Sequence, residues 1–120
     1  MVEQTDGLQL PEVLSSREHE ALQALKRPLF DEFPFVESLI LFGSVVHGAA
    51  DEESDVDLLV LTDRKLDRFR RHEITGVVFE VNLEYDTNFS VLVADRESWN
   101  SGPASVLPIH ADVEEYGVPV

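Results

Sequence analysis

The chain contains no cysteine among its 120 residues. This absence excludes a disulfide framework and a thiolate-ligated zinc site, so any metal would be held by oxygen or imidazole ligands. Basic residues are also scarce, with nine Lys and Arg against 24 Asp and Glu and a net charge of -15. Such a field repels phosphate backbones over roughly a Debye length, about 8 Å at physiological salt, so we expect no DNA binding.

Long apolar runs and a leader-like N-terminus are missing as well. No run approaches the length needed to cross a membrane, and we therefore expect a soluble, cytoplasmic protein. Only Lys26 and Lys65 are lysines, and the acidic residues are scattered instead of forming one tail. That composition is typical of adaptation to high salt, which we take as a hypothesis about the source.

The length and the 43% of apolar residues suit one compact domain. Residues 1–14 show no sustained period and contain Gly7 and Pro11. We predict that they form a tail, either loosely docked or disordered, ahead of a single domain over residues 15–120.

A helix is predicted over Ser16–Phe33. Ser15 and Glu18 have the spacing of a capping box, and the leucines that follow lie on one helical face. Pro28 predicts a kink within it. Short apolar runs predict buried strands, and weaker patterns predict a short helix after the first strand and another near the C-terminus. The strands are Val36–Phe42, Asp55–Leu61 and Phe89–Val93; the helices are Gly43–Gly48 and Ala104–Tyr116.

The segment Thr75–Tyr85 has two interpretations. Alternate residues from Val77 onward are apolar, as in a strand, and its β-branched residues favour that structure. Ile74, Val78 and Val81 also have helical spacing. The periodicity alone does not decide between them.

The stretch between the first two strands carries a polar signature that a plain hairpin does not need. Gly43 and Ser44 end one strand, where a glycine permits close approach to a ligand and a following helix would direct its N–H groups at an anion. Gly48 permits a turn without a side chain. Asp55 and Asp57 open the next strand, where residues two apart face the same side.

Two neighbouring carboxylates raise one another's pKa unless a cation joins them, and magnesium prefers oxygen ligands. We therefore predict that Asp55 and Asp57 bind Mg²⁺ and are the catalytic pair, whereas Gly43, Ser44 and Gly48 bind the phosphates of a nucleoside triphosphate. Two metal ions about 3.5–4 Å apart would suit transfer chemistry with pyrophosphate as the leaving group.

Gly43-Ser44, ten residues, then Asp55-Val56-Asp57 resembles the GSX10DXD signature of minimal nucleotidyltransferases in the DNA polymerase β-like superfamily. The stretches "LFGS", "SDVDLLV" and "LEYD…SVLVADRESW" extend the resemblance. It implies an α/β (α+β) fold, with a short mixed sheet flanked by helices and a crossover helix over Thr75–Tyr85. It also implies an antitoxin-like enzyme that transfers AMP from ATP to a hydroxyl of a HEPN-domain toxin, in a homo- or hetero-oligomer.

The chain departs from the family pattern at three positions. Val45 and His47 stand where the family usually has arginines, and Ser90 stands where many relatives have a third carboxylate. Glu80 or Glu84 could supply that third acid. These departures favour an alternative, a catalytically degenerate subunit that acts by protein binding only.

The remaining candidates are assigned structural roles. His47 lies three residues from Ser44, but no G-x-S-x-G elbow or orienting acid is evident, so we reject a nucleophile–base pair. Trp99 is expected to anchor the C-terminal connection. The basic cluster at 64–71 is expected to be a solvated helix face, with contact to a partner or to the triphosphate as the alternative.

Overall fold

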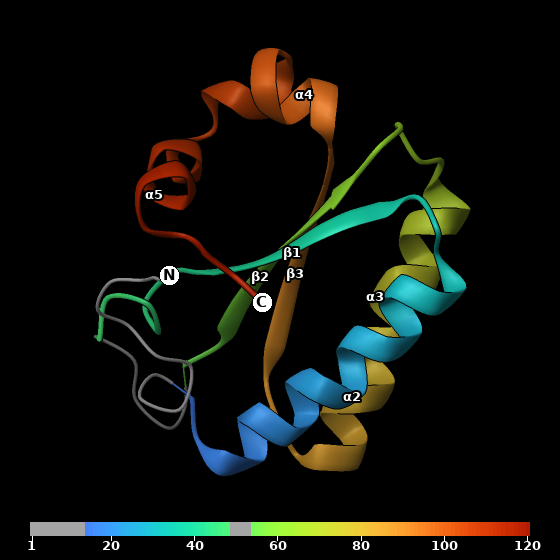
Figure 1. Ribbon diagram of the computed structural model, residues 1–120, viewed down its shortest axis with the longest axis vertical. Coiled ribbons are helices and arrows are strands. Elements are labelled where there is room, and N and C mark those ends of the chain that lie inside the picture. The colour runs from blue at the N-terminus through green and yellow to red at the C-terminus, as the bar shows by residue number, and fades with distance from the viewer. Residues whose placement is uncertain (1–13, 49–53) are drawn as a thin grey trace, which may run out of the picture.

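The computed structural model describes residues 14–48 and 54–120, so the predicted tail at 1–13 and the loop residues 49–53 lie outside the described residues. Four strands form one mixed sheet in the order β3-β2-β1-β4. β2 and β3 are parallel, whereas β1 is antiparallel to both β2 and β4 (Figure 1). The strands are β1 (Val36–Phe42), β2 (Val56–Thr62), β3 (Phe89–Asp95) and β4 (Val118–Pro119).

Helices cover both faces of this sheet (Figure 1). One face is covered by α2 (Ser16–Glu32) and α3 (Arg68–Tyr85). The opposite face is covered by α4 (Arg96–Ser101), the 3₁₀ turn η1 (Pro103–Val106) and α5 (Pro108–Tyr116). This is the α/β architecture with a short mixed sheet that the resemblance implies.

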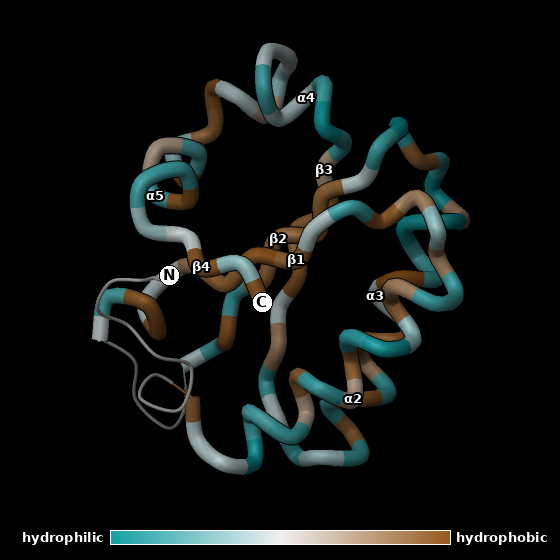
Figure 2. The backbone as a smooth tube through the Cα atoms, viewed as in Figure 1, coloured by the Kyte–Doolittle hydropathy of each residue, from teal (hydrophilic) through white to brown (hydrophobic). Residues whose placement is uncertain are grey.

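The central strands are apolar on both faces because both faces are covered (Figure 2). In β2, Val56, Leu58 and Val60 belong to the core beneath α2 and α3. Leu59 belongs to the second core, with Trp99 of α4. By this alternation Asp57 lies on the face that α4 and α5 cover.

The structure confirms the N-terminal helix that the capping box and the leucine spacing predict. The Glu18 amide donates to Ser15 Oγ (3.1 Å), and the Ser15 amide donates to Glu18 Oε1 (2.9 Å). The helix continues through Pro28 to Glu32. Leu14, placed in the tail by its sequence, is 5% exposed and packs in the core.

The ambiguous segment 75–85 is helical, as the resemblance implies, and not the strand that its residue propensities favour. Asp67 caps the N-terminus of α3 by accepting from the Arg70 amide (2.8 Å). Ile74, Val78 and Val81 are buried at helical spacing. Tertiary burial thus outweighs β propensity here.

The single helix predicted over Ala104–Tyr116 is divided in the structure. Leu107, which precedes Pro108, is extended at φ -67° and ψ 142° and separates η1 from α5. The residue before a proline disfavours the helical conformation, which explains the break. Trp99 is 1% exposed and donates from Nε1 to Glu114 Oε2 (2.8 Å), which confirms its anchoring role and joins α4 to α5.

No described helix is long and apolar enough to cross a membrane.

Asn82 fixes the connection from α3 to β3. Its Oδ1 accepts from the Phe89 amide (2.8 Å) and from Thr87 Oγ1 (3.0 Å), and its Nδ2 donates to the Phe89 carbonyl (3.0 Å). Phe89 pairs in register with Val56, the residue between the two aspartates. Asn82 therefore helps to hold the start of β2 in place.

We expect Asn82→Ala to lower the free energy of unfolding by about 1–3 kcal/mol, because half-buried groups of Phe89 and Thr87 lose their partner. Urea denaturation followed by circular dichroism measures this change. Asn100→Ala, at an exposed position, serves as the control and should change stability by less than about 0.5 kcal/mol. Equal effects of the two substitutions would contradict the assigned role.

Candidate functional site

The strand ends that carry the candidate residues meet at one corner of the sheet. Phe42, the last residue of β1, pairs with Asp57, the second residue of β2. A methyl group added at Gly43 would overlap Asp57 Oδ2 and lie 3.1 Å from its Cγ. The glycine and the second aspartate are therefore in direct proximity, which is the arrangement that the sequence spacing predicts.

The segment after β1 consists of turns, and the prediction of a short helix at Gly43–Gly48 was wrong. The amides of Val46 and His47 donate to the Gly43 carbonyl (3.1 and 3.4 Å), and the Gly48 amide donates to Val45 (3.2 Å). Gly43 and Gly48 have φ of +87° and +71°. These left-handed conformations favour glycine and do not continue a right-handed helix.

Two valines anchor this turn in the core. Val45 is 5% exposed and Val46 is 4% exposed, and both pack beneath α2 and α3. Val45 stands where the resemblance expects an arginine, so that position contributes packing and no positive charge. Ser44, beside Gly43, remains half-buried.

The two aspartates interact electrostatically. Asp57 is half-buried and Asp55 is exposed, while Val56 between them is fully buried. Burial raises the pKa of the Asp57 carboxyl, and the negative charge of Asp55 raises it further. A divalent cation would remove this repulsion, and both carboxylates are at least partly exposed, so their oxygen donors fit Mg²⁺.

The described residues place no third acidic side chain with Asp55 and Asp57 in a metal-binding group. Within residues 14–48 and 54–120, no group of three or more His, Asp and Glu side chains could hold a metal ion. Ser90 pairs in register with Asp57, so this neighbouring position on β3 carries a hydroxyl. Glu80 and Glu84 are exposed on α3, which covers the opposite face of the sheet.

The structure gives His47 an acidic partner that sequence reasoning missed. His47 Nε2 lies 2.6 Å from Asp112 Oδ1, and its ring packs edge-on against Tyr116 at 4.8 Å between centroids. Asp112 and Tyr116 both belong to α5. The contact ties the turn after Gly43 to the helix that covers this face of the sheet. His47 and Asp112 are 65 residues apart in the sequence, so no local pattern could predict their contact.

The basic cluster lies away from the aspartates. It follows the C-terminal end of β2, and a seven-residue strand spans about 20 Å. Arg64 pairs with Asp63 (2.6 Å), and this hydrogen bond lowers the pKa of Asp63. Arg70 pairs with Glu73 (3.3 Å). The cluster is an exposed surface, as predicted, and its alternative role at the triphosphate does not fit this placement.

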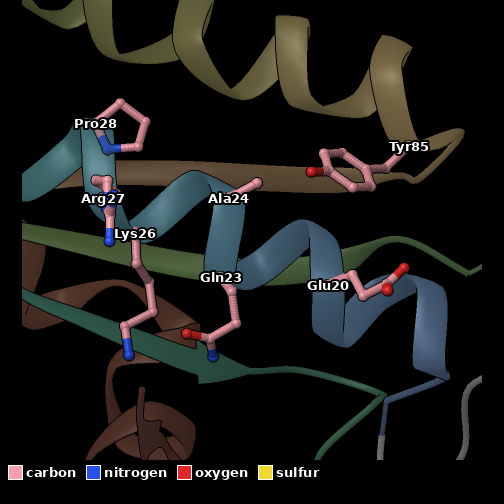
Figure 3. A pocket seen from close by; sticks show the side chains of 7 residues that line it. All are labelled: Glu20, Gln23, Ala24, Lys26, Arg27, Pro28 and Tyr85. Carbon is pink, nitrogen blue, oxygen red and sulfur yellow. The ribbon is translucent and has the colours of Figure 1, made fainter.

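A hollow of about 530 Å³ lies elsewhere, on the outer side of α2 (Figure 3). Six residues of α2, including Glu20 and Arg27, and Tyr85 from the end of α3 line it. None of the candidate phosphate or metal residues contributes to it. The corner at Gly43 and Asp57 is therefore separate from this hollow.

We expect Asp57→Asn to raise the thermal stability of the metal-free protein at neutral pH. The pKa of Asp57 is higher in the folded state than in the unfolded state, so the ionised carboxylate destabilises the fold at neutral pH. This destabilisation is lost as the pH falls through the folded-state pKa towards the unfolded-state pKa. The gain should therefore vanish below about pH 4, where the carboxyl is protonated in both states. Thermal unfolding in EDTA across a pH series measures it; a stability loss at neutral pH would contradict the electrostatic account.

Comparison with known proteins identifies relatives over most of the chain. The model of the nucleotidyltransferase domain family matches residues 22–103. A Methanocaldococcus jannaschii protein named "Putative protein adenylyltransferase MJ0141" is 32% identical over 85 residues, which cover 71% of this chain and 79% of that protein. A second from the same organism, "Putative protein adenylyltransferase MJ1305", is 40% identical over 83 residues, covering 65% of this chain and 53% of that one.

Solved structures share the fold. A structure described as a "toxin-antitoxin with AMP-PNP" has a TM-score of 0.55 at 22% identity, covering 83% of this chain and 69% of that one. The toxin–antitoxin MntA-HepT has a TM-score of 0.52 at 19% identity, covering 84% and 69%. The family match covers more than half of the chain, and the chain therefore belongs to the nucleotidyltransferase domain family.

Proposed function

We propose that this nucleotidyltransferase moves AMP from ATP to a hydroxyl group of a partner protein, with Mg²⁺ held by Asp55 and Asp57. The observation that carries the proposal is the direct approach of Gly43 to the Asp57 carboxylate. It brings a backbone suited to close phosphate contact next to a carboxylate pair suited to a cation. The names of the two relatives support adenylyl transfer to protein.

Each residue of the site has a distinct task in this proposal. Asp55 and Asp57 ligate the cation, and their mutual repulsion in its absence favours binding. Ser44 donates its hydroxyl to a phosphate oxygen. Gly43 and Gly48 allow the turn to approach the triphosphate without a side chain in the way. When bound, Mg²⁺ would neutralise triphosphate charge and favour deprotonation of the acceptor hydroxyl.

The transfer itself is a displacement at the α-phosphorus of ATP. The acceptor oxygen forms a bond to that phosphorus, the bond to the bridging oxygen breaks, and pyrophosphate leaves with the electron pair. The hydroxyl proton is released to solvent. The chain's own residues orient the triphosphate and hold its charge, which is the main protein contribution to such reactions.

We further propose a HEPN-domain toxin as the acceptor, so that the chain acts as an antitoxin. The structural neighbours named as toxin–antitoxin complexes support this partner.

A second candidate function is binding without catalysis. Val45 is buried in the core, and Ser90 replaces an acid beside Asp57. A degenerate subunit would retain the fold and bind its partner but would have little affinity for the triphosphate. Calorimetric titration with ATP and Mg²⁺ separates the two, because an enzyme must bind the nucleotide.

Labelling by ATP tests the proposed transfer. We expect α-phosphate label, and not γ-phosphate label, to appear on a co-purified HEPN-domain protein. Asp57→Asn should reduce this labelling by at least about 100-fold, since one cation ligand is lost. Asp31→Asn, an exposed acid on α2, is the matched control and should retain it. Undiminished labelling by the Asp57 variant would overturn the assigned role.

The contact between His47 and Asp112 gives a separate prediction. Asp112→Asn should raise the KM for ATP by about 3–10-fold with a smaller change in kcat, because an amide oxygen is a weaker partner for His47 Nε2 than a carboxylate and the turn is held less firmly to α5. Asp112→Glu should restore part of the affinity. Steady-state kinetics over ATP concentration measures both, and a change confined to kcat would contradict a nucleotide-positioning role.

A further inference from the structure

In the described part of the chain, the outer edge of β3 has no strand beside it. β3 is the last strand of the sheet and pairs only with β2, in parallel. The Val56 amide donates to the Asn88 carbonyl (2.9 Å), so the backbone groups of every second residue from Asn88 face β2. The amides and carbonyls of Phe89, Val91 and Val93 therefore point away from the sheet.

Asn82 occupies the first position of this edge. Its side-chain amide accepts from the Phe89 amide (2.8 Å) and donates to the Phe89 carbonyl (3.0 Å), as a residue of an added strand would. Within residues 14–48 and 54–120, Val91 and Val93 have no such partner on their outward side. The edge is therefore shaped for strand pairing beyond the position that Asn82 fills.

The side chains along this edge are apolar and incompletely covered. Residues 58–60 of β2 are fully buried, whereas their register partners Val91, Leu92 and Val93 are only half-buried. Charged residues and prolines commonly protect a strand edge from pairing, and Phe89–Ala94 contains neither. The edge is thus open to a strand from another chain.

The edge of β3 begins beside the candidate site. Ser90 pairs in register with Asp57, and the alternation along both strands places the two side chains on the same face of the sheet. Neighbouring strands lie about 4.8 Å apart, so an added strand would lie about 10 Å from Asp57, across the position of Ser90. Ser90 is small and exposed, which leaves room for a side chain of that strand to reach towards the carboxylates.

We propose that the acceptor protein adds an extended segment to the edge of β3, which brings its hydroxyl-bearing residue to the Asp57 end. This inference rests on the proposed transfer of AMP and adds how the acceptor is held. The backbone of the segment would bond with Val91 and Val93, and its hydroxyl-bearing side chain would lie opposite Ser90. In this mode of recognition the main-chain bonds supply affinity and the alternating side chains supply specificity.

Both ends of the β3 edge are acidic. Asp55 and Asp57 lie beside its start, because Val56 between them pairs in register with Phe89. Glu97, in the first turn of α4, is exposed just beyond its end. A segment whose apolar middle is flanked by Lys or Arg would therefore be complementary to this edge.

A second copy of the chain fits this edge poorly. Two β3 strands that pair across a two-fold axis perpendicular to the sheet run antiparallel, so Glu97 of each copy would face the aspartates of the other. The arginines near the edge are already paired, Arg17 with Asp86 (3.3 Å) and Arg96 with Glu37. Each copy also has a net charge of -15. Charge therefore favours a basic acceptor segment over self-association.

Amide hydrogen exchange measured by NMR tests the docking residue by residue. In the free chain, the Val91 and Val93 amides should exchange fast, whereas the Leu92 amide, which faces β2, should be protected. Addition of the co-purified HEPN-domain protein as acceptor should slow exchange at Val91 and Val93 by at least about tenfold. The Phe89 amide, already held by Asn82, is the internal control and should change little.

Two proline variants test whether the edge is needed for transfer. Val91→Pro and Val93→Pro each remove an outward amide and keep the bonds to β2, and an edge strand tolerates proline at such positions. Each should reduce labelling of the acceptor by α-labelled ATP at least about tenfold, because a donor is lost and the ring obstructs the added strand. Ser16→Pro, at the first position of α2, where proline is favoured, is the control and should label normally.

Calorimetric titration with ATP and Mg²⁺ separates the docking from the nucleotide site. The affinity for ATP should stay within about twofold in both proline variants, because Gly43, Asp55 and Asp57 are unchanged. Native circular dichroism checks that each variant folds. If a variant does not fold, the exchange measurement on the wild-type chain decides alone.

The outcomes distinguish this inference from the proposed function. A wild-type chain that labels no acceptor overturns the transfer function and this inference with it. Labelling by the wild type while the Val91 and Val93 amides stay unprotected in the complex overturns the docking alone, as does undiminished labelling by both folded proline variants. Protection of these amides that rises with the concentration of the chain alone would assign the edge to a second copy and also overturn the docking.

Discussion

The candidate site depends on the absence of a side chain at Gly43. The antiparallel pairing of β1 and β2 brings the end of one strand against the start of the next, and any Cβ at Gly43 would overlap the Asp57 carboxylate. The φ of Gly43 is +87°, a left-handed conformation that also favours glycine at this position. Val45 and Val46 then bury the following turn, so the hydrophobic core fixes where the polar corner lies.

Local sequence signals predicted the N-terminal helix, the three long strands and the meeting of Gly43 with Asp57. The capping box at Ser15 and Glu18 acts within one turn of helix. The buried strands follow from short apolar runs, and only the ends differ: β2 begins at Val56 instead of Asp55. The convergence of Gly43 and Asp57 follows from two such strands joined by a short link. Spacing therefore predicted that Gly43 and Asp57 meet, and residue chemistry suggested a cation and a phosphate there, whereas AMP transfer to a partner protein was suggested by the family resemblance and stays a proposal.

The sequence left two features undecided or unseen, one because two periodicities compete and the other because the contact joins distant parts of the chain. Segment 75–85 satisfies both periods because α3 is apolar inside, at Ile74 and Val78, and outside, at Phe79 and Leu83. A helix with two apolar sides loses the amphipathic signal that sequence reasoning uses. The pairing of His47 with Asp112 crosses 65 residues and depends on the return of the chain through α5. Two further errors had local signals that the sequence analysis did not use: Pro108 marks the break within the predicted helix Ala104–Tyr116, and Asp95 caps α4, a helix that was not predicted.

The separation of charges across the molecule constrains how it can bind a polyphosphate. The arginines of α3 lie beyond the far end of β2, and Val45 offers no cation at the turn. His47 is engaged with Asp112. Near the corner there remain two carboxylates that repel a bare triphosphate. In the proposed function the affinity for ATP therefore depends chiefly on the cation, and the fold contributes the place where that cation and the turn backbone meet.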